Sequence, residues 1–435
     1  MLRLGAGLAA GLAAALLLAS CGSSPSSGPT SPTSSNRAPS ATAASAPKQQ
    51  PAPTPSTKTA PGSANLLRLI TEPDQGISAI YSLLTSPRRT LDMTMYEFVD
   101  TTAENVLAAD AARGVTVRVM LDRNEEGAAN TPAYDYLASH GVHVAWAPAS
   151  YEATHEKSVV IDAGQPDAEA LIMTLNLTSK YYATTRDFAI IDTDPADVAA
   201  IESVFNSDYA GRSIVAPPGA DLLWSPGSQP ALVSLIDSAR TSLYVENEEM
   251  GAPAVTAALA GAAERGVSVD VTMTADSEWD QAFAQLTAAG VRVHLYPDTD
   301  SALYIHAKAI ISDGRTAFVG SENFSVASLD YNRELGIITT DPTVVSGIAS
   351  IITADYARAA SVKSSSPAAA TPRPAPASSG TAPRSTSCYP LSNEGTCYEP
   401  GEYCRDDDHG SNGVAGDGDP ITCESADGGW KWESR

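Results

Sequence analysis

Two short stretches of this sequence carry the same reactive residue types at the same spacing, His-x-Lys-x4-Asp. Their members are His155, Lys157 and Asp162 in the first copy and His306, Lys308 and Asp313 in the second. An asparagine follows each copy, and an acid stands eleven residues after it: Asn176 with Asp187, and Asn323 with Glu334. A single His-x-Lys pair arises easily by chance on a solvated strand. Two copies with the same downstream residues indicate a functional site.

This set of side chains suits a phosphate ester. Lysine offers a point charge and asparagine offers amide donors, and both stabilise negative charge on phosphate oxygens. One imidazole can attack phosphorus while the other protonates the leaving oxygen. An acid beside each imidazole would hold its tautomer and orientation. The residue types therefore predict one phosphodiester site built from both copies.

The sequence around the two motifs repeats as well. Residues 111–117 and 263–269 share Ala-x-Arg-Gly-Val-x-Val, and residues 136–144 and 285–293 share a Leu and a Gly-Val-x-Val. The offset between the copies stays near 150 residues, which is too long for a solenoid repeat. We therefore expect two copies of one α/β half, residues 65–212 and 213–360, packed as a monomer around a single site.

Periodicity predicts strands that alternate with helices in both halves. We expect helices at 76–84, 103–113, 134–139, 230–239, 255–265 and 281–288, and strands at 90–98, 115–121, 142–146, 242–248, 267–272 and 291–296. Such alternation is typical of an α/β fold with mostly parallel sheets flanked by helices. The apolar, β-branched residues 158–161 and 309–311 predict further strands. Since residues two apart on a strand share a face, the His and Lys of each copy should point the same way.

The doubled motif resembles the signature of the phospholipase D superfamily, which is a doubled His-x-Lys-x4-Asp with a following Gly-Ser-x-Asn. The resemblance covers about residues 65–360. It implies a two-step phosphodiester exchange through a covalent phosphohistidine, with no metal and no other cofactor. By this resemblance His155 would be the nucleophile and His306 the general acid.

The resemblance also implies roles for the remaining motif residues. Lys157, Lys308, Asn176 and Asn323 would hold the phosphate. The family crosses its supporting acids between halves, so Glu334 would orient His155 and Asp187 would orient His306. The motif aspartates Asp162 and Asp313 would be structural and would tie down the hairpin that follows each motif.

The first copy departs from the family signature. It has Met173-Thr174-Leu175 before Asn176, whereas the second copy keeps Gly320 and Ser321. Thr174 supplies a hydroxyl in place of serine, so Thr174 and Ser321 are candidate substrate-binding residues. Met173 loses the close backbone approach that glycine permits. The nucleophile half is therefore the less regular of the two.

Acidic and aromatic residues stand at two corresponding strand ends. These are Glu246–Glu249 in the second half and Tyr96–Glu97 in the first. Strand ends often line the cleft of α/β proteins. Two interpretations stay open at this point: these residues shape specificity, or they are simply solvated.

The amino terminus indicates export. A basic start is followed by an apolar run from Leu4 to Leu18, which is the pattern of a signal peptide. Leu18-Ala-Ser-Cys21 resembles the lipobox of bacterial lipoproteins, so residues 1–21 would end in a lipidated Cys21; ordinary cleavage is the alternative. Residues 22–64 are rich in Ser, Pro, Thr and Ala and are expected to form a disordered stalk. We expect a lipid-anchored protein outside the cell membrane, or a secreted one.

The carboxyl terminus predicts a small separate module. A second Ala, Ser, Pro and Thr linker covers residues 361–387. The module, residues 388–435, holds Cys388, Cys397, Cys404 and Cys423. An even cysteine count in an exported chain favours two disulfides, with three possible connectivities. The spacing fits neither a zinc finger nor an EF-hand, so a solvated acidic module is expected.

Charge separates the possible substrates. The chain has a formal net charge of −24, and residues 65–360 hold 40 acids against 17 bases. Such a surface repels nucleic acid, which argues against the nuclease branch of the family. The first hypothesis is a phospholipase D that hydrolyses phospholipids to phosphatidic acid and an alcohol. The alternatives are a phosphatidyltransferase like cardiolipin synthase, and a surface binding protein with a decayed site.

Overall fold

The computed structural model describes residues 66–362 without a gap, and residues 389, 397–398, 404, 410–415, 420–426 and 429–434 of the tail. The expected signal peptide with Cys21, the stalk, most of the second linker and Cys388 lie outside the described residues. Within the described ranges, no helix has the length and apolar character needed to cross a membrane.

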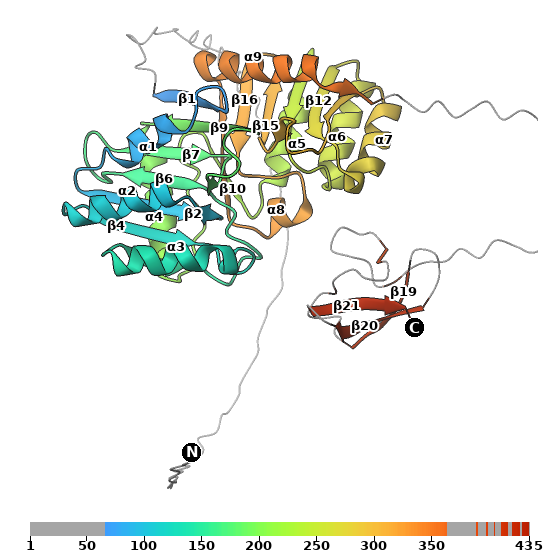
Figure 1. The fold of residues 1–435 in the computed structure, drawn as a ribbon. Coiled ribbons are helices and arrows are strands. Elements are labelled where there is room, and N and C mark those ends of the chain that lie inside the picture. Colours follow the sequence, from blue (N-terminus) through green and yellow to red (C-terminus); the bar gives the residue numbers. More distant parts are fainter. Residues whose placement is uncertain are drawn as a thin grey trace, which may run out of the picture. The chain divides into compact units, whose positions relative to one another are not determined.

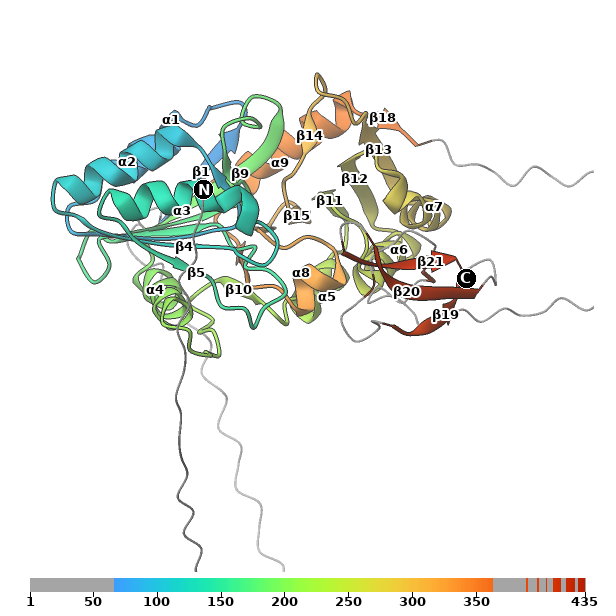
Figure 2. The same cartoon turned by 60° about the horizontal axis from the view of Figure 1, so that its bottom comes forward.

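The first half is a sheet between two helical layers. Its strand order is β1 (Leu67–Glu72), β9 (Thr185–Asp192), β7 (Glu169–Met173), β6 (Ser158–Ile161), β2 (Thr90–Met95), β4 (Thr116–Leu121) and β5 (His143–Trp146). One face packs against α1 (Ser78–Leu84), α2 (Thr101–Ala112) and α3 (Gly127–Ser139). The other face packs against α4 (Pro195–Tyr209), as Figure 2 shows.

The second half repeats this plan. Its strand order is β10 (Leu222–Ser225), β17 (Glu334–Thr339), β16 (Thr316–Gly320), β15 (Ala309–Ser312), β11 (Ser242–Glu246), β12 (Ser268–Thr274), β13 (Arg292–Tyr296) and β18 (Ala360–Ser361). Helices α5 (Gln229–Ser238), α6 (Pro253–Glu264) and α7 (Asp280–Ala288) cover one face. Helix α9 (Pro342–Arg358) lies along the other (Figure 1). Because β18 still pairs with β13, the second half extends to this strand, past the boundary expected at residue 360.

The α/β class and the two repeated halves are confirmed, but the sheets are mixed. In the first half β2, β4 and β5 pair in parallel, whereas the pairs β2–β6, β6–β7, β7–β9 and β9–β1 are antiparallel. The expectation of mostly parallel sheets is therefore wrong. The reason is that a short turn follows each motif, and such a turn can join only antiparallel strands.

Besides the apolar core within each half, the two halves share a third one. Side chains of α4 and α9 meet residues of both sheets there, including Val160 and Ile190 from the first half and Ile311 and Ile337 from the second. The Asp-Pro pairs at 194–195 and 341–342 start both helices, and the aspartate side chains accept backbone N–H groups of the first turn. Neither helix was expected from apolar spacing, although Asp followed by Pro is a recognisable helix start.

The backbone before each motif histidine crosses to the other half. Strand β14 (Tyr304–Ile305) pairs in parallel with Thr185 and Arg186 of β9, which makes it the eighth strand of the first sheet. Thr154 forms the corresponding parallel bridge to Arg333. The prediction that His and Lys stand on the following strand is wrong in detail, because β6 and β15 begin after the lysines. Each His-x-Lys instead lies between the residues that pair with the opposite half and the next strand of its own half.

Each motif aspartate accepts backbone N–H groups at the start of a neighbouring strand. The carboxylate of Asp162 accepts the backbone N–H groups of Arg88, Arg89 and Thr90, at 2.6 to 3.1 Å. Asp313 accepts three corresponding N–H groups before β11. Burial would raise the pKa of Asp162, but these N–H groups lower it overall, so the carboxylate is charged. Both aspartates have positive φ angles, 52° and 53°, which Asp and Asn tolerate better than most residues.

We expect the substitution Asp162→Ala to lower the free energy of unfolding by about 2 kcal/mol, because backbone donors lose their acceptor and alanine strains the positive φ. Asp162→Asn should cost less, since asparagine accepts hydrogen bonds and adopts this conformation. Urea unfolding of the three proteins measures the difference. Equal midpoints for the alanine variant and the wild type would contradict this structural role.

The tail folds as a small antiparallel sheet. Strands β19 (Asn412–Val414), β20 (Pro420–Ala426) and β21 (Gly429–Ser434) pair in sequence order. Cys404 and Cys423 form a disulfide, and Cys397 is disulfide-bonded as well. Trp432 and Tyr398 pack in the module's own core. The expected disulfide-held module is therefore present.

Candidate active site

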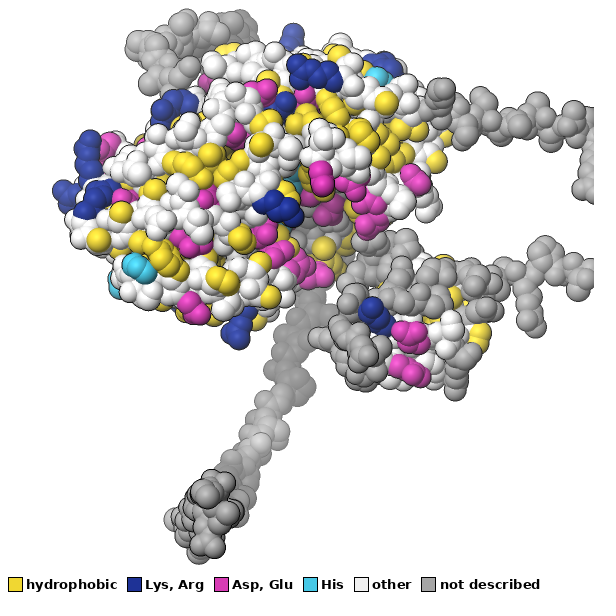
Figure 3. Space-filling view, viewed as in Figure 1, with side chains coloured by type: hydrophobic (Ala, Val, Ile, Leu, Met, Phe, Trp, Pro, Cys, Tyr) yellow, Lys and Arg dark blue, Asp and Glu magenta, His cyan; other side chains and the backbone are white. Residues whose placement is uncertain are grey.

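A cleft of about 510 Å³ brings the two motifs together. Both histidines, His155 and His306, line it, and so do Asn176 and Asn323. Figure 3 shows Asp and Glu side chains gathered at the hollow between the halves. The residues that the sequence placed 151 positions apart therefore face one common space.

Each histidine is held by the acid of the opposite half. His155 Nδ1 lies 2.8 Å from Glu334 Oε2, and His306 Nδ1 lies 2.7 Å from Asp187 Oδ1. The crossed backbone pairs cause this arrangement, because Thr154 and Ile305 each come directly before a histidine and pair next to the opposite acid. A proton on each Nδ1 would be donated to a carboxylate, which leaves each Nε2 free for chemistry.

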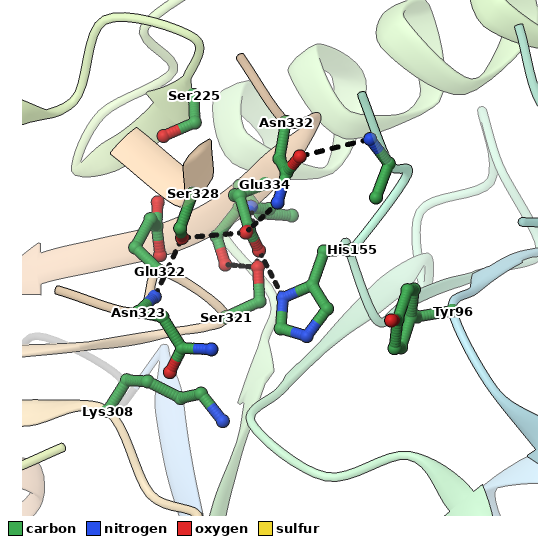
Figure 4. Close-up of polar contacts among 12 residues, drawn as sticks. Tyr96, His155, Ser225, Lys308, Ser321, Glu322, Asn323, Ser328, Asn332 and Glu334 are labelled. Atoms are coloured by element: carbon green, nitrogen blue, oxygen red, sulfur yellow. Dashed lines mark hydrogen bonds and ion pairs between the residues drawn. The ribbon is translucent and has the colours of Figure 1, made fainter. Parts of the chain in front are cut away.

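The acid behind His155 sits in a buried polar network. Glu334 Oε1 accepts a hydrogen bond from Ser328 Oγ at 2.7 Å and one from Asn332 Nδ2 at 3.4 Å (Figure 4). Burial would raise the pKa of Glu334, but the neighbouring His155 and Lys157 lower it overall. The carboxylate therefore stays ionised and fixes the imidazole.

The two candidate substrate-binding hydroxyls lie behind the histidines. Thr174 is fully buried, and its Oγ1 donates to Asp187 Oδ1 at 2.5 Å while accepting the N–H of Phe188 at 2.9 Å. Ser321 is also fully buried, and its Oγ accepts the N–H of Leu335 at 3.0 Å. Neither residue lines the cleft. Their hydroxyls instead bind residues of β9 and β17, the strands that carry Asp187 and Glu334. The expectation that Thr174 and Ser321 contact the substrate is therefore wrong.

Burial makes His155 a neutral base. It lowers the pKa of His155 to about 4, more than the attraction of Glu334 raises it. The Nε2 lone pair is therefore free at neutral pH. His306 has carboxylates at both ring nitrogens, since its Nε2 lies 3.5 Å from Glu248 Oε2. The surroundings of the two histidines therefore differ, because His155 has a carboxylate at Nδ1 and His306 has carboxylates near both ring nitrogens.

Both lysines lie directly behind the cleft wall. Lys157 and Lys308 are almost completely buried, and neither lines the cleft. Lys157 Nζ lies 5.0 Å from the ring centre of Tyr96 and donates no hydrogen bond to any residue in the described ranges. Lys308 Nζ donates to Glu248 Oε2 at 2.8 Å and to the carbonyl of His306 at 2.6 Å. Tyr96 and Glu248 therefore separate the lysines from the cleft.

Two buried arginines join the halves beside the site. Arg186 Nε lies 2.5 Å from Asp355 of α9, and Arg333 Nε lies 2.8 Å from Asp208 of α4. Each arginine directly precedes a supporting acid, and each aspartate belongs to the opposite half. Neither arginine was among the site residues predicted from the sequence. Their signal was present, because Arg-Asp and Arg-Glu recur at the same place in both copies.

We expect a bell-shaped pH dependence of kcat/KM. The acid limb should follow His155, whose neutral form is lost as pH falls towards its pKa of about 4. The alkaline limb should follow Lys157, because burial lowers its pKa to about 7 and its charge is lost above that pH. Lys157→Arg should move the alkaline limb upward, since guanidinium stays charged. An alkaline limb at the same pH in this variant would contradict the assignment.

Comparison with known proteins agrees with this geometry. The family profile described as "Cardiolipin synthase, PLD-like domain" matches residues 80–209 and 232–356, more than half of the chain. Cardiolipin synthase A of Serratia proteamaculans (strain 568) is 25% identical over 349 residues, which cover 66% of this chain and 68% of that protein. The corresponding enzyme of Pseudomonas syringae pv. syringae (strain B728a) is 25% identical over 348 residues, or 69% and 71% of the two chains.

The solved structure of phosphatidylserine synthase from Haemophilus influenzae Rd KW20 shares the fold. Its TM-score is 0.54 at 12% identity, over 69% of this chain and 88% of that one. Two α/β halves that each contribute one histidine to a common cleft define a class of two-lobed phosphodiester enzymes. The chain belongs to the phospholipase D superfamily, and each matched segment contains one copy of the motif.

Proposed function

We propose that this protein is a phosphatidyltransferase, which moves the phosphatidyl group of a phospholipid to an alcohol through a phosphohistidine. One observation carries the proposal. Two imidazoles from separate halves line one cleft, and each has its Nδ1 bound to the acid of the other half. This is the arrangement that a two-step exchange at phosphorus needs.

In the first step, Nε2 of His155 attacks phosphorus and the bond from phosphorus to the leaving alcohol oxygen breaks. His306 donates its Nε2 proton to that oxygen. In the second step, an acceptor alcohol gives its proton to His306 and attacks phosphorus, and the bond from phosphorus to His155 breaks. Glu334 offsets the positive charge that develops on His155, because it lies 2.8 Å from Nδ1.

The phosphate oxygens would be held by the two lysines and two asparagines. Figure 4 shows the side chains of Asn323 and Lys308 next to each other, and both donate to the same oxygen of Glu248. Lys157 Nζ is buried without a hydrogen-bond acceptor among the described residues, and a buried cation of this kind favours the binding of an anion. The complete set of reactive residues argues against a decayed binding protein.

An alcohol acceptor is favoured by the comparisons, since the matched relatives are named cardiolipin synthases. Hydrolysis was the first hypothesis from the sequence, and water as the acceptor is the second candidate. The excess of acids over bases in residues 65–360 disfavours a nucleic-acid substrate. We also propose that Cys21 carries a lipid, which would keep an acidic protein at a bilayer without electrostatic docking.

A product assay on the full chain tests this function. Vesicles of mixed phospholipids are incubated with and without added alcohol, and DNA serves as a parallel substrate. We expect transfer products in the presence of alcohol, unchanged by a chelator. Phosphatidic acid as the sole product at every alcohol concentration would select hydrolysis. Cleavage of DNA alone would overturn both lipid activities.

A further inference from the structure

A carboxylate of the protein occupies the place that the mechanism assigns to phosphate. Glu248 Oε2 accepts a hydrogen bond from Lys308 Nζ at 2.8 Å and a longer one from Asn323 Nδ2 at 3.4 Å, while the same Asn323 amide donates to Glu249 Oε1 at 2.8 Å. The same oxygen lies 3.5 Å from His306 Nε2. A lysine, an asparagine and a histidine are the donors that the proposed function gives to a phosphate oxygen. In the second half, these donors are already in use.

The first half has a different residue at this position. Thr94 pairs with Ser158, and Glu246 pairs with Ala309, so the two strands have the same register relative to their motifs. Two residues further along lie Tyr96 and Glu248. Tyr96 covers Lys157 with its ring and leaves the amine without a hydrogen-bond acceptor among the described residues. The doubled site is therefore asymmetric, with one lysine unpaired and one paired to Glu248.

A phosphate cannot share these donors with Glu248, because two anions in contact repel each other strongly in a partly buried site. The carboxylate has room to move away. A second cavity of about 230 Å³, lined by Glu248 itself and by Glu249, Asp276 and Asp298, adjoins the position. Tyr304 OH, which donates to Glu248 Oε1 at 2.9 Å, lines both spaces.

The displaced carboxylate would find no lysine or arginine in its new surroundings, since none lines these two spaces where the structure describes their walls. His306 lines the main cleft, but the proposed function commits its Nε2 proton to the leaving oxygen. An unpaired charge is costly in such a place. The substrate must therefore bring a positive group. Tyr96, Tyr181, Tyr182 and Tyr304 line the main cleft, and the face of an aromatic ring attracts ammonium groups.

We propose that Glu248 is a specificity residue, whose carboxylate is replaced by the substrate phosphate at Lys308 and Asn323 and then pairs with an ammonium group on the alcohol portion of the substrate. This inference rests on the proposed function for its second part. It predicts that the protein prefers phospholipids, or acceptor alcohols, that carry an amine over those that carry only hydroxyl groups.

The first experiment measures anion binding without turnover. Inorganic phosphate is titrated into the full chain by calorimetry at fixed ionic strength, for the wild type, Glu248→Gln and Asp300→Asn. We expect Glu248→Gln to bind phosphate about tenfold more tightly, because one competing negative charge is removed. Asp300 lines the same cleft and has no contact with Lys308 or Asn323 among the described interactions, so Asp300→Asn controls for the change in net charge. Equal affinity in all three proteins, or equal gains in both variants, would overturn the proposal.

The second experiment measures headgroup choice. Vesicles with equal amounts of phosphatidylethanolamine and phosphatidylglycerol are offered to the same three proteins, and consumption of each lipid is followed. We expect the wild type and Asp300→Asn to prefer phosphatidylethanolamine and Glu248→Gln to lose that preference. The same ratio in all three proteins would overturn the pairing with ammonium. Absence of turnover on every lipid would instead count against the proposed function, and phosphate binding would still decide the role of Glu248.

Discussion

Replacing His155 should abolish phosphodiester exchange, with a loss of about 10³-fold or more. His155→Asn is the more informative variant, because an asparagine amide can still donate to Glu334 and so protects that buried acid from losing its partner. Neither His155→Ala nor His155→Asn can form the covalent bond to phosphorus. Both steps of the reaction should therefore disappear together.

The matched variant is His306→Ala, which should fail differently. A substrate with a nitrophenol leaving group needs no proton from the enzyme in the first step. We expect His306→Ala to release one equivalent of nitrophenol and to accumulate a phosphorylated protein, which mass spectrometry detects on His155. The His155 variants should give neither signal. A covalent adduct in His155→Asn, or wild-type turnover in either variant, would refute the assigned roles.

The second large effect concerns stability rather than chemistry. Arg333 is buried, and its guanidinium contacts both carboxylate oxygens of Asp208, at 2.8 and 3.3 Å. Arg333→Met would leave Asp208 as an unpaired buried charge, and such a loss typically costs about 3 to 5 kcal/mol. The pair joins α4 of the first half to the strand that carries Glu334. We therefore expect a lower unfolding midpoint and a less rigid contact between Glu334 and His155.

Two further variants separate the ion pair from simple packing. The double variant Arg333→Met with Asp208→Leu should recover much of the stability, because no unpaired charge remains. Arg68→Met removes an exposed pair with Glu169 and should cost at most about 1 kcal/mol. Chemical unfolding of the four proteins gives the comparison. A double variant as unstable as Arg333→Met would show that the charge is not the cause.

Corresponding residues of the two halves have different contacts in the site. The lysine of the first half, Lys157, lies behind Tyr96 without a hydrogen-bond acceptor among the described residues, and the lysine of the second half, Lys308, is paired with Glu248. His306 lies next to that carboxylate, while burial lowers the pKa of His155 and keeps it neutral. Two nearly equal motifs thus have different surroundings, which can give their histidines the different roles proposed above through burial and nearby charge.

The reactive residues, their doubling and the two α/β halves were all predictable from the sequence. These features depend on local spacing, because the periodicities of strands and helices and the distances within a motif can be read from the sequence alone. The resemblance to the phospholipase D superfamily extended this to the crossed acids, although the sequence contains no direct record of a contact between residues 119 or 179 positions apart.

Only the tertiary structure decided which groups meet. In the structure Thr174 and Ser321 hydrogen-bond away from the cleft, and Glu248 accepts a hydrogen bond from Lys308. Arg186 and Arg333 form ion pairs with aspartates of the opposite halves. The structure also has mixed sheets in place of the expected parallel ones. The physical reason is common to all of these. Each depends on how two apolar faces pack around the shared core, and packing fixes distances between segments that local sequence patterns leave free.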